Sequence, residues 1–212
     1  MKRFDIITEA DARTLDVGAT VELTPGGHIT PLARDTLAAR RITVVSAGIH
    51  DASLSEDLTP VSDVRRIAIG SDHTGQTLKR TLIQRLRSRG LAVNDVGSDT
   101  NDPVDYPDVA AAVARAVARH EADAGVVIDG AGIGSTIAAN KIPGIRAANC
   151  TDETIARYSR EHNGANVIAL GSTTLPGETA ARILDVWLAT PMREPRYIRR
   201  LLKIRRLEQQ AR

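Results

Sequence analysis

From Arg65 onward, short apolar runs alternate with longer stretches in which apolar positions recur every three to four residues. The runs have the length of buried strands, and the longer stretches have the period of amphipathic helices. Strands are predicted over Ile67–Gly70, Ala92–Val96, Gly125–Ile128, Ala147–Cys150 and Val167–Leu170. Helices are predicted over Leu78–Arg87, Val109–Arg119, Ile133–Asn140, Glu153–Arg160, Glu178–Leu188 and Tyr197–Gln209. This alternation predicts an α/β fold, namely a Rossmann-like, doubly wound, five-stranded parallel sheet in a three-layer αβα arrangement.

The first 46 residues have a separate, smaller αβαβ-like pattern. Helices are predicted over Glu9–Leu15 and Leu32–Arg40, and strands over Thr20–Leu23 and Ile42–Val45. Thr8 and Thr30 are predicted helix caps, and Pro25-Gly26-Gly27 is predicted to end the first strand. The predicted organisation is a small N-terminal α/β module over residues 1–46, a linker over 47–64 and a main domain over 65–212.

Composition narrows the class of protein. Hydrophobic residues make up 42% of the 212 residues and aromatic residues only 2%, so the core must be aliphatic, as in buried parallel strands. Cys150 is the only cysteine, which excludes an internal disulfide. The chain has no signal-peptide pattern and no apolar run of about 18 residues, so we expect a cytoplasmic protein without a membrane partner.

The net charge of +2 does not select a partner, but basic residues are concentrated near the C-terminus. Eight Lys or Arg lie between residues 193 and 212. Such a cluster suits a phosphate-bearing ligand or nucleic acid, and it equally suits a solvated helix face.

In parallel sheets, ligands bind at the carboxyl ends of the strands. Asp72 and His73 follow the first predicted strand of the main domain. This pair can bond sugar hydroxyls and hold an anion, or Asp72 can simply cap the next helix.

The third strand is followed by Asp129 and then by glycines at 130, 132 and 134. Alternating glycines allow successive backbone N–H groups to point into one concavity that suits a phosphate or an enolate oxygen. The spacing differs from that of dinucleotide-binding folds. Asp129 is either a general base at this loop or a carboxylate that only accepts loop amides.

Two further sets of polar residues follow. His162 and Asn163 share a short polar run after a predicted helix, where a lone histidine would otherwise be structural. Arg196 and Arg200 are four residues apart, so a helix would place them on one face as a phosphate clamp.

These motifs together resemble one family. They are Ile69–Gly75, Asp105-Tyr106-Pro107, Gly130–Gly134, Ala138–Gly144, Arg160–Val167 and Arg196…Arg200. In this order, over about residues 65–208, they resemble type B ribose-5-phosphate isomerases and galactose-6-phosphate isomerases.

The resemblance implies an aldose–ketose isomerase that acts on ribose 5-phosphate, or a close tetrose or hexose phosphate, through a cis-enediolate. It implies a homodimer or homotetramer with each site built from two subunits, and no metal or cofactor. By position, Asp129 would be the base, His162 would open the furanose ring and Asp72 would contact the ring oxygen or a hydroxyl. The substrate-binding residues would be His73, Tyr106, Gly130, Ala131, Gly132, Gly134, Asn163, Arg196 and Arg200.

The chain departs from the family pattern at several site positions. Asp129 replaces a common catalytic cysteine, and Ser135 stands where other members carry a catalytic glutamate. The remaining departures are Ala131 for threonine, Thr173 for arginine and Tyr197 for histidine. Asp129 is therefore the only carboxylate of the loop, and Thr173 and Tyr197 put the identity of the sugar in question.

The N-terminal module resembles, more loosely, short modules fused to enzymes of bacterial microcompartments. The matching residues are Ile7–Asp11 and Ile29–Asp35. This predicts a docking or encapsulation role, and removal of residues 1–60 is expected to leave catalysis intact.

Two other functions compete with an isomerase. The altered loop suits a sugar-phosphate-binding subunit without catalysis, and the basic C-terminal segment suits a nucleic-acid binder. Few aromatic side chains are present for base stacking, so no nucleic-acid partner is expected.

Overall fold

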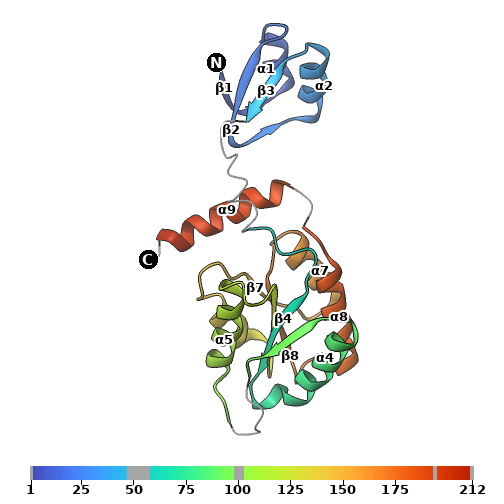
Figure 1. Ribbon diagram of the computed structural model, residues 1–212. Helices are drawn as coiled ribbons and strands as arrows, with labels where there is room; N and C mark the ends of the chain where they lie inside the picture. Colours follow the sequence, from blue (N-terminus) through green and yellow to red (C-terminus); the bar gives the residue numbers. More distant parts are fainter. Residues whose placement is uncertain (1, 47–57, 98–102, 193–194, 211–212) are drawn as a thin grey trace. The chain divides into compact units, whose positions relative to one another are not determined.

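The computed structural model describes residues 2–46, 58–97, 103–192 and 195–210, without the side chains of residues 25, 26, 46, 195 and 196. The chain divides into two compact units, Met1–Glu56 and Asp57–Arg212 (Figure 1). Among the described residues, no helix has the length and apolar character needed to cross a membrane.

The first unit is a three-stranded parallel sheet with two helices. Its elements are β1 (Arg3–Ile7), α1 (Glu9–Thr14), β2 (Thr20–Ile29), α2 (Pro31–Ala39) and β3 (Thr43–Ser46), with the strand order β1-β2-β3. Thr8 and Asp11 form a reciprocal capping box at α1, and Thr30 caps α2. The unit has its own apolar core, centred on residues such as Ile7, Ala12 and Leu37.

Two predictions about this unit are wrong. The αβαβ-like pattern omitted β1, in which the exposed residues Arg3 and Asp5 interrupt the apolar residues and leave no long apolar run. The proline–glycine segment does not end β2 either, because β2 continues to Ile29 and pairs again with β1 at Ile6 and Ile7 after a register shift. Such irregularities accommodate proline and glycine within a strand.

The second unit is the predicted Rossmann-like domain. Its strands are β4 (Arg66–Ser71), β5 (Ala92–Asp95), β6 (Ala124–Asp129), β7 (Ala147–Asn149) and β8 (Val167–Gly171). Its helices are η1 (His73–Gly75), α4 (Gln76–Ser88), α5 (Tyr106–Ala118), α6 (Ile133–Ala139), α7 (Glu153–Glu161), α8 (Gly177–Ala189) and α9 (Pro195–Gln210). The strands form one parallel sheet in the order β5-β4-β6-β8-β7. All five strands and six helices predicted from Arg65 onward are confirmed, with small shifts at their ends.

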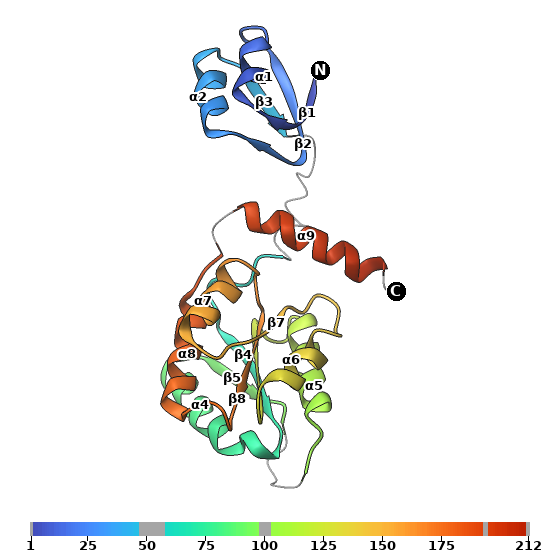
Figure 2. The same ribbon diagram turned by 180° about the vertical axis from the view of Figure 1, so that it is seen from behind.

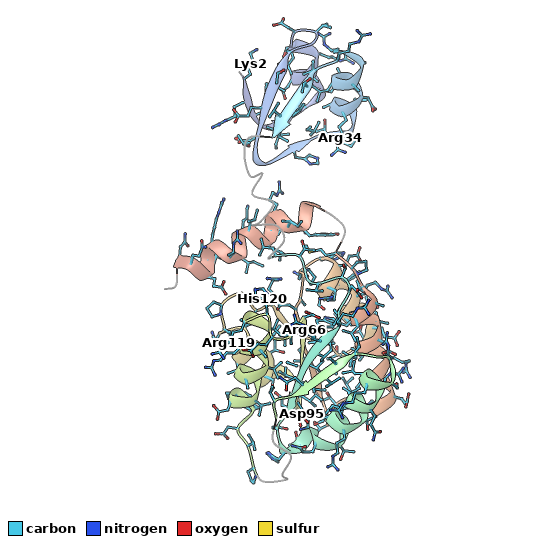
Figure 3. The ribbon with its side chains drawn as sticks, in the orientation of Figure 1. Lys2, Arg34, Arg66, Asp95, Arg119 and His120 are labelled. Carbon is cyan, nitrogen blue, oxygen red and sulfur yellow. The ribbon has the colours of Figure 1, made fainter. Side chains whose placement is uncertain are left out.

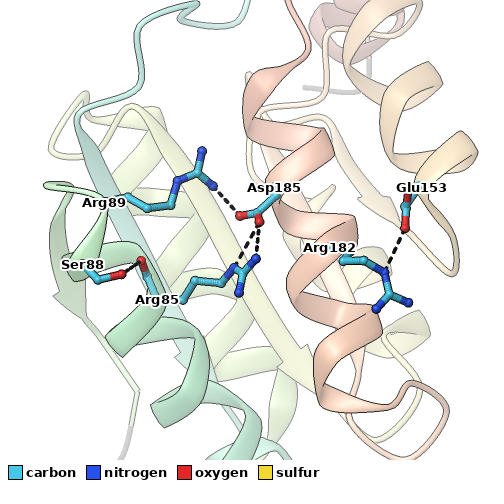
Figure 4. A network of polar contacts seen from close by, with 6 residues as sticks. All are labelled: Arg85, Ser88, Arg89, Glu153, Arg182 and Asp185. Atoms are coloured by element: carbon cyan, nitrogen blue, oxygen red, sulfur yellow. Dashed lines mark hydrogen bonds and ion pairs between the residues drawn. The ribbon is translucent and has the colours of Figure 1, made fainter.

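Helices cover both faces of this sheet, as a doubly wound fold requires (Figures 1 and 2). One core contains residues of α4, α7 and α8, and the other contains residues of α5 and α6. Asp185 of α8 accepts bonds from Arg85 of α4 and from Arg89, the C-cap of α4. Arg182 of α8 contacts Glu153 of α7 (Figure 4). The helices on that face are thus linked by surface ion pairs as well as by apolar packing.

Residues 58–64, which we call the strap, belong to the second unit and not to a linker. Leu58 is 3% exposed, and its carbonyl accepts a bond of 3.0 Å from Arg146 Nη2. The carbonyl of Val61 accepts a bond of 2.8 Å from Arg160 Nη2. The predicted domain boundary at residue 65 therefore lies too far along the chain, because the packed unit already includes Leu58.

Burial lowers the pKa of both Arg146 and Arg160 to about 10. The Arg160 side chain is fully buried, and its guanidinium lies 4.6 Å from the ring centre of Trp187. Buried cations need acceptors, and the strap carbonyls supply one to each.

Candidate active site

The chemistry-bearing residues gather at the two ends of the parallel strands. We call the side of the sheet at the carboxyl ends of the strands the carboxyl edge, and the opposite side the amino edge. The strand order places the topological switch point between β4 and β6, where ligands bind in open α/β sheets. Figure 3 marks the two edges, with Arg66 and His120 near the amino ends of the strands and Asp95 at the carboxyl end. Asp72 directly follows β4 and Asp129 is the last residue of β6, so both lie at the carboxyl edge.

Asp72 joins the two strand ends and caps η1. Its backbone N–H donates to Ile128 O at 3.1 Å. Its Oδ1 accepts from Thr74 N at 2.9 Å, Gly75 N at 3.2 Å and the Thr74 hydroxyl at 2.6 Å. The capping role weighed from the sequence is thus present, and His73 beside it is exposed.

Asp129 turns into its own loop. Its Oδ1 accepts from the amides of Ala131, at 2.9 Å, and Gly132, and its Oδ2 accepts from Ser135 N at 2.8 Å. The residue is 5% exposed. The concavity predicted to receive a substrate oxygen is thus filled in part by Asp129, as in the second of the two roles weighed from the sequence.

The loop needs its glycines. Gly132 has φ +78°, a left-handed conformation that disfavours side chains. A Cβ on Gly134 would lie 2.6 Å from the Tyr106 ring. Tyr106, at the start of α5, therefore packs directly against the loop and is itself 42% exposed.

Several residues that sequence reasoning did not assign support this loop. Thr173 donates its hydroxyl to Gly130 O at 2.6 Å. Asn149 Nδ2 donates to Ala131 O at 3.2 Å, and the hydroxyls of Thr74 and Ser172 lie 3.3 Å apart. Ser172 and Thr173 follow β8, and Asn149 ends β7, so the rule about strand ends was the signal that pointed to them.

The second group lies at the amino edge. His162 ends α7, and its ring contacts those of Tyr158 and Tyr197, with both pairs of ring centres 4.6 Å apart. The Arg200 guanidinium lies 5.6 Å from the Tyr197 ring centre. Asn163 is exposed beside His162. Arg196 begins the same helix as Arg200, but its side chain lies outside the described residues.

Chain direction separates the two groups. α7 follows β7 and returns to the start of β8, so His162 lies where β8 begins and Asp129 lies where β6 ends. Five to six strand residues span roughly 15–20 Å. α9 also belongs to the amino edge, because Glu208 accepts a bond of 2.8 Å from Gly144 N, which precedes β7. One chain thus does not bring His162 or Arg200 to its own Asp129.

Cys150 is outside both groups and is fully buried. Burial raises the pKa of its thiol to about 11, so very little thiolate forms at neutral pH. We expect a disulfide reagent such as DTNB to label this cysteine only after unfolding, and Cys150→Ser to keep the activity of the parent chain. Rapid labelling of the native protein, or a large loss of activity, would contradict this.

This chain is similar in sequence to known sugar-phosphate isomerases. The family model described as Ribose/Galactose Isomerase matches residues 67–204. The ribose-5-phosphate isomerase B of Escherichia coli (strain K12) is 42% identical over 146 residues, which are 69% of this chain and 98% of the relative. A D-erythrulose-4-phosphate isomerase of Pectobacterium atrosepticum is 42% identical over 123 residues, 58% of this chain and 81% of the relative.

Solved structures similar to this chain are also ribose-5-phosphate isomerases B. The ribose-5-phosphate isomerase B of Clostridium thermocellum is 47% identical, with a TM-score of 0.68 over 69% of this chain and 99% of that one. A structure from Mycoplasma genitalium with bound ribulose-5-phosphate is 37% identical, with a TM-score of 0.66 over 68% of this chain and 96% of that one. Within the described residues, no group of three or more His, Cys, Asp or Glu is arranged to hold a metal ion.

Proposed function

The chain belongs to the ribose/galactose isomerase family of aldose–ketose isomerases that act on phosphorylated sugars, and from this we propose a pentose phosphate, ribose 5-phosphate, as its substrate. A tetrose phosphate is the alternative, because the D-erythrulose-4-phosphate isomerase has the same 42% identity as the ribose-5-phosphate isomerase B, although over 123 residues and not 146. The observation that carries the function is the glycine loop at the switch point, bounded by Asp72, Asp129 and Tyr106.

We propose that two copies of the chain build each site. The carboxyl edge of one copy would supply Asp72, His73, Tyr106 and the Asp129 loop. The amino edge of the other would supply the remaining residues, namely His162, Asn163, Arg196 and Arg200. The separation of these groups within one chain supports this arrangement, which suits a homodimer or a homotetramer made of such dimers.

Exposed apolar side chains beside the loop also support an interface. Ile133 and Ile137 lie one turn apart on α6, directly after the glycine loop, and are 57% and 59% exposed. Neighbouring exposed isoleucines are typical of a surface that another chain covers. A partner on this face of α6 would lie next to the proposed catalytic loop.

The proposed reaction begins with ring opening and continues with proton transfer. His162 of the second copy gives a proton to the ring oxygen as its bond to C1 breaks, and the anomeric hydroxyl loses its proton to water to become the aldehyde oxygen. Asp72 holds a sugar hydroxyl. Asp129 then takes the C2 proton and the C1 carbonyl oxygen gains the charge, which gives a cis-enediolate. A proton passes from O2 to O1, and Asp129 returns its proton to C1 to leave the C2 ketone.

Asp129 remains usable as a base despite its loop bonds. A carboxylate has about four lone-pair positions, and three amides engage three of them. Oδ2 accepts one of these bonds and is therefore the proposed proton acceptor. Arg196, Arg200 and His73 would hold the phosphate, and those loop amides that do not already donate to Asp129 would favour the charge that develops on the enediolate.

A deuterium experiment tests the function. In D₂O, the protein should convert ribose 5-phosphate to ribulose 5-phosphate and place deuterium at the carbon that receives the proton, as followed by NMR. Erythrose 4-phosphate and hexose 6-phosphates complete the panel. Binding of a sugar phosphate without conversion or deuterium uptake would instead identify a non-catalytic binding subunit, a role that the inward turn of Asp129 favours.

Substitutions at Asp129 separate a base from a structural carboxylate. Asp129→Asn should reduce turnover at least about 10²-fold, since a placed base contributes about 10²–10⁴. Asp129→Cys should recover part of the loss, with a rate that rises as the thiol ionises near its ordinary pKa of about 8.5. If both variants are equally inactive at every pH, Asp129 only shapes the loop.

We propose that the N-terminal module is a docking element for partner proteins, such as components of a bacterial microcompartment. Its separate core and its position before the family match, which begins at residue 67, support a role outside catalysis. A chain that begins at Asp57 should then keep its activity and lose the association.

A further inference from the structure

The His162 imidazole lies between two tyrosine rings, and we propose that Tyr158 and Tyr197 position it for furanose ring opening. The inference rests on the proposed function, in which His162 gives a proton to the ring oxygen. Tyr158 and Tyr197 would then be positioning residues that act on ring opening and not on the later proton transfer.

The two contacts come from different helices. Tyr158 lies one turn before His162 on α7, and their rings are 17° from parallel. Tyr197 comes from the first turns of α9, and its ring is tilted 33° from the imidazole. Both centre-to-centre distances, 4.6 Å, are within the range of favourable aromatic pairs.

Contacts with two rings limit the movements of the imidazole. Rotation about the Cβ–Cγ bond of His162 would drive the edge of the imidazole into a tyrosine ring, so the plane of the imidazole is fixed. The nitrogens lie at the ring edge, where Nε2 is 4.0 Å from Glu161 Oε1. A proton therefore leaves or reaches Nε2 in the plane of the imidazole, and the two tyrosines fix the orientation of that plane.

Tyr197 also fixes the imidazole relative to the phosphate-binding helix. Tyr197 is 6% exposed, and Leu201, one turn later, is 1% exposed, so both anchor α9 to the domain. Arg200 leaves the same helix with its guanidinium 5.6 Å from the Tyr197 ring centre. The stack thus sets the distance between a proton donor and a phosphate-binding cation, which is what a bound cyclic sugar phosphate requires.

Substrates that cannot cyclise isolate the ring-opening step. Ribose 5-phosphate is a closed furanose in solution. Ribulose 5-phosphate and erythrose 4-phosphate cannot form a furanose, because the phosphate blocks the hydroxyl that would close the ring. A residue that acts through ring opening should matter for ribose 5-phosphate and not for erythrose 4-phosphate. For ribulose 5-phosphate, kcat/KM must fall by the same factor as for ribose 5-phosphate, because the two directions share one equilibrium constant.

The test compares leucine and phenylalanine variants of the full-length chain. Tyr197→Leu and Tyr158→Leu should each lower kcat/KM for ribose 5-phosphate about 10- to 100-fold, since small displacements of a reacting group carry such costs. The kcat/KM for erythrose 4-phosphate should stay within about threefold. Tyr197→Phe and Tyr158→Phe keep the rings and should lose much less kcat/KM for ribose 5-phosphate than the leucine variants.

The outcomes are separable. Equal losses with ribose 5-phosphate and erythrose 4-phosphate would overturn the inference and leave Tyr197 a structural residue, as would unchanged rates in both leucine variants. Tyr158 is 48% exposed, so its leucine variant should fold even if that of Tyr197 does not. A parent chain that isomerises none of the three substrates would refute the proposed function itself, a result distinct from the first two.

Discussion

A dimer that contains one Asp129→Asn chain and one His162→Gln chain should recover about half of the parent activity, although each variant alone is nearly inactive. In such a dimer, one site combines both altered edges. The other site combines the intact carboxyl edge of the His162→Gln chain with the intact amino edge of the Asp129→Asn chain. Activity returns only if each site uses opposite edges of two chains.

The measurement requires a purified mixed dimer. The two variants are co-expressed with different affinity tags, and the dimer that carries both tags is assayed with ribose 5-phosphate. The matched control pairs Asp129→Asn with Asp72→Asn, two changes at the same edge. That mixed dimer has one altered carboxyl edge in each site and should stay inactive. If neither pair recovers, the site lies within one chain and the proposed assembly is wrong.

The separation of the two edges illustrates what the sequence can predict. Apolar periodicity identified β4 to β8, because buried parallel strands are continuous runs of aliphatic residues. From that alternation alone, the direction of the chain places Asp129 after a strand and His162 after a helix, at opposite edges. A single-chain site with the arginines beside Asp129 was therefore inconsistent with the predicted topology, while the shared site implied by the family resemblance agreed with it.

Residue types alone do not determine the contacts of Asp129, the aromatic stack around His162 or the packing of the strap. A carboxylate after a strand can bind a ligand or accept from loop amides, and only the coordinates show that Ala131, Gly132 and Ser135 donate to Asp129. The aromatic stack depends on α9 lying over the end of α7, which two helical periods far apart in sequence do not reveal. The strap shows no helix or strand periodicity in its sequence. Its contribution to the fold is made by backbone carbonyls, which accept bonds from Arg146 and Arg160.

Removal of the strap should destabilise the domain far more than removal of the N-terminal module. A chain that begins at Arg65 leaves Arg146 and Arg160 each without one acceptor, and an unsatisfied buried polar group costs about 1–3 kcal/mol. It also loses the burial of Leu58, worth about 1.5–3 kcal/mol. Together these terms are a large part of a typical domain stability of about 5–15 kcal/mol.

Thermal unfolding of three chains measures this effect. Relative to the full-length protein, residues 57–212 should unfold within a few degrees, because both strap carbonyls and Leu58 remain. Residues 65–212 should unfold on the order of 10 °C lower, since 1 kcal/mol shifts the midpoint of a domain of this size by about 2–4 °C or more. A chain that begins at Val61 loses the Leu58 carbonyl but keeps that of Val61, and should lie between them. The expectation that removal of residues 1–60 leaves catalysis intact requires that this chain still folds at the assay temperature. Equal midpoints for the chains that begin at Asp57 and Arg65 would mean that water replaces the strap carbonyls around the two guanidiniums at no cost.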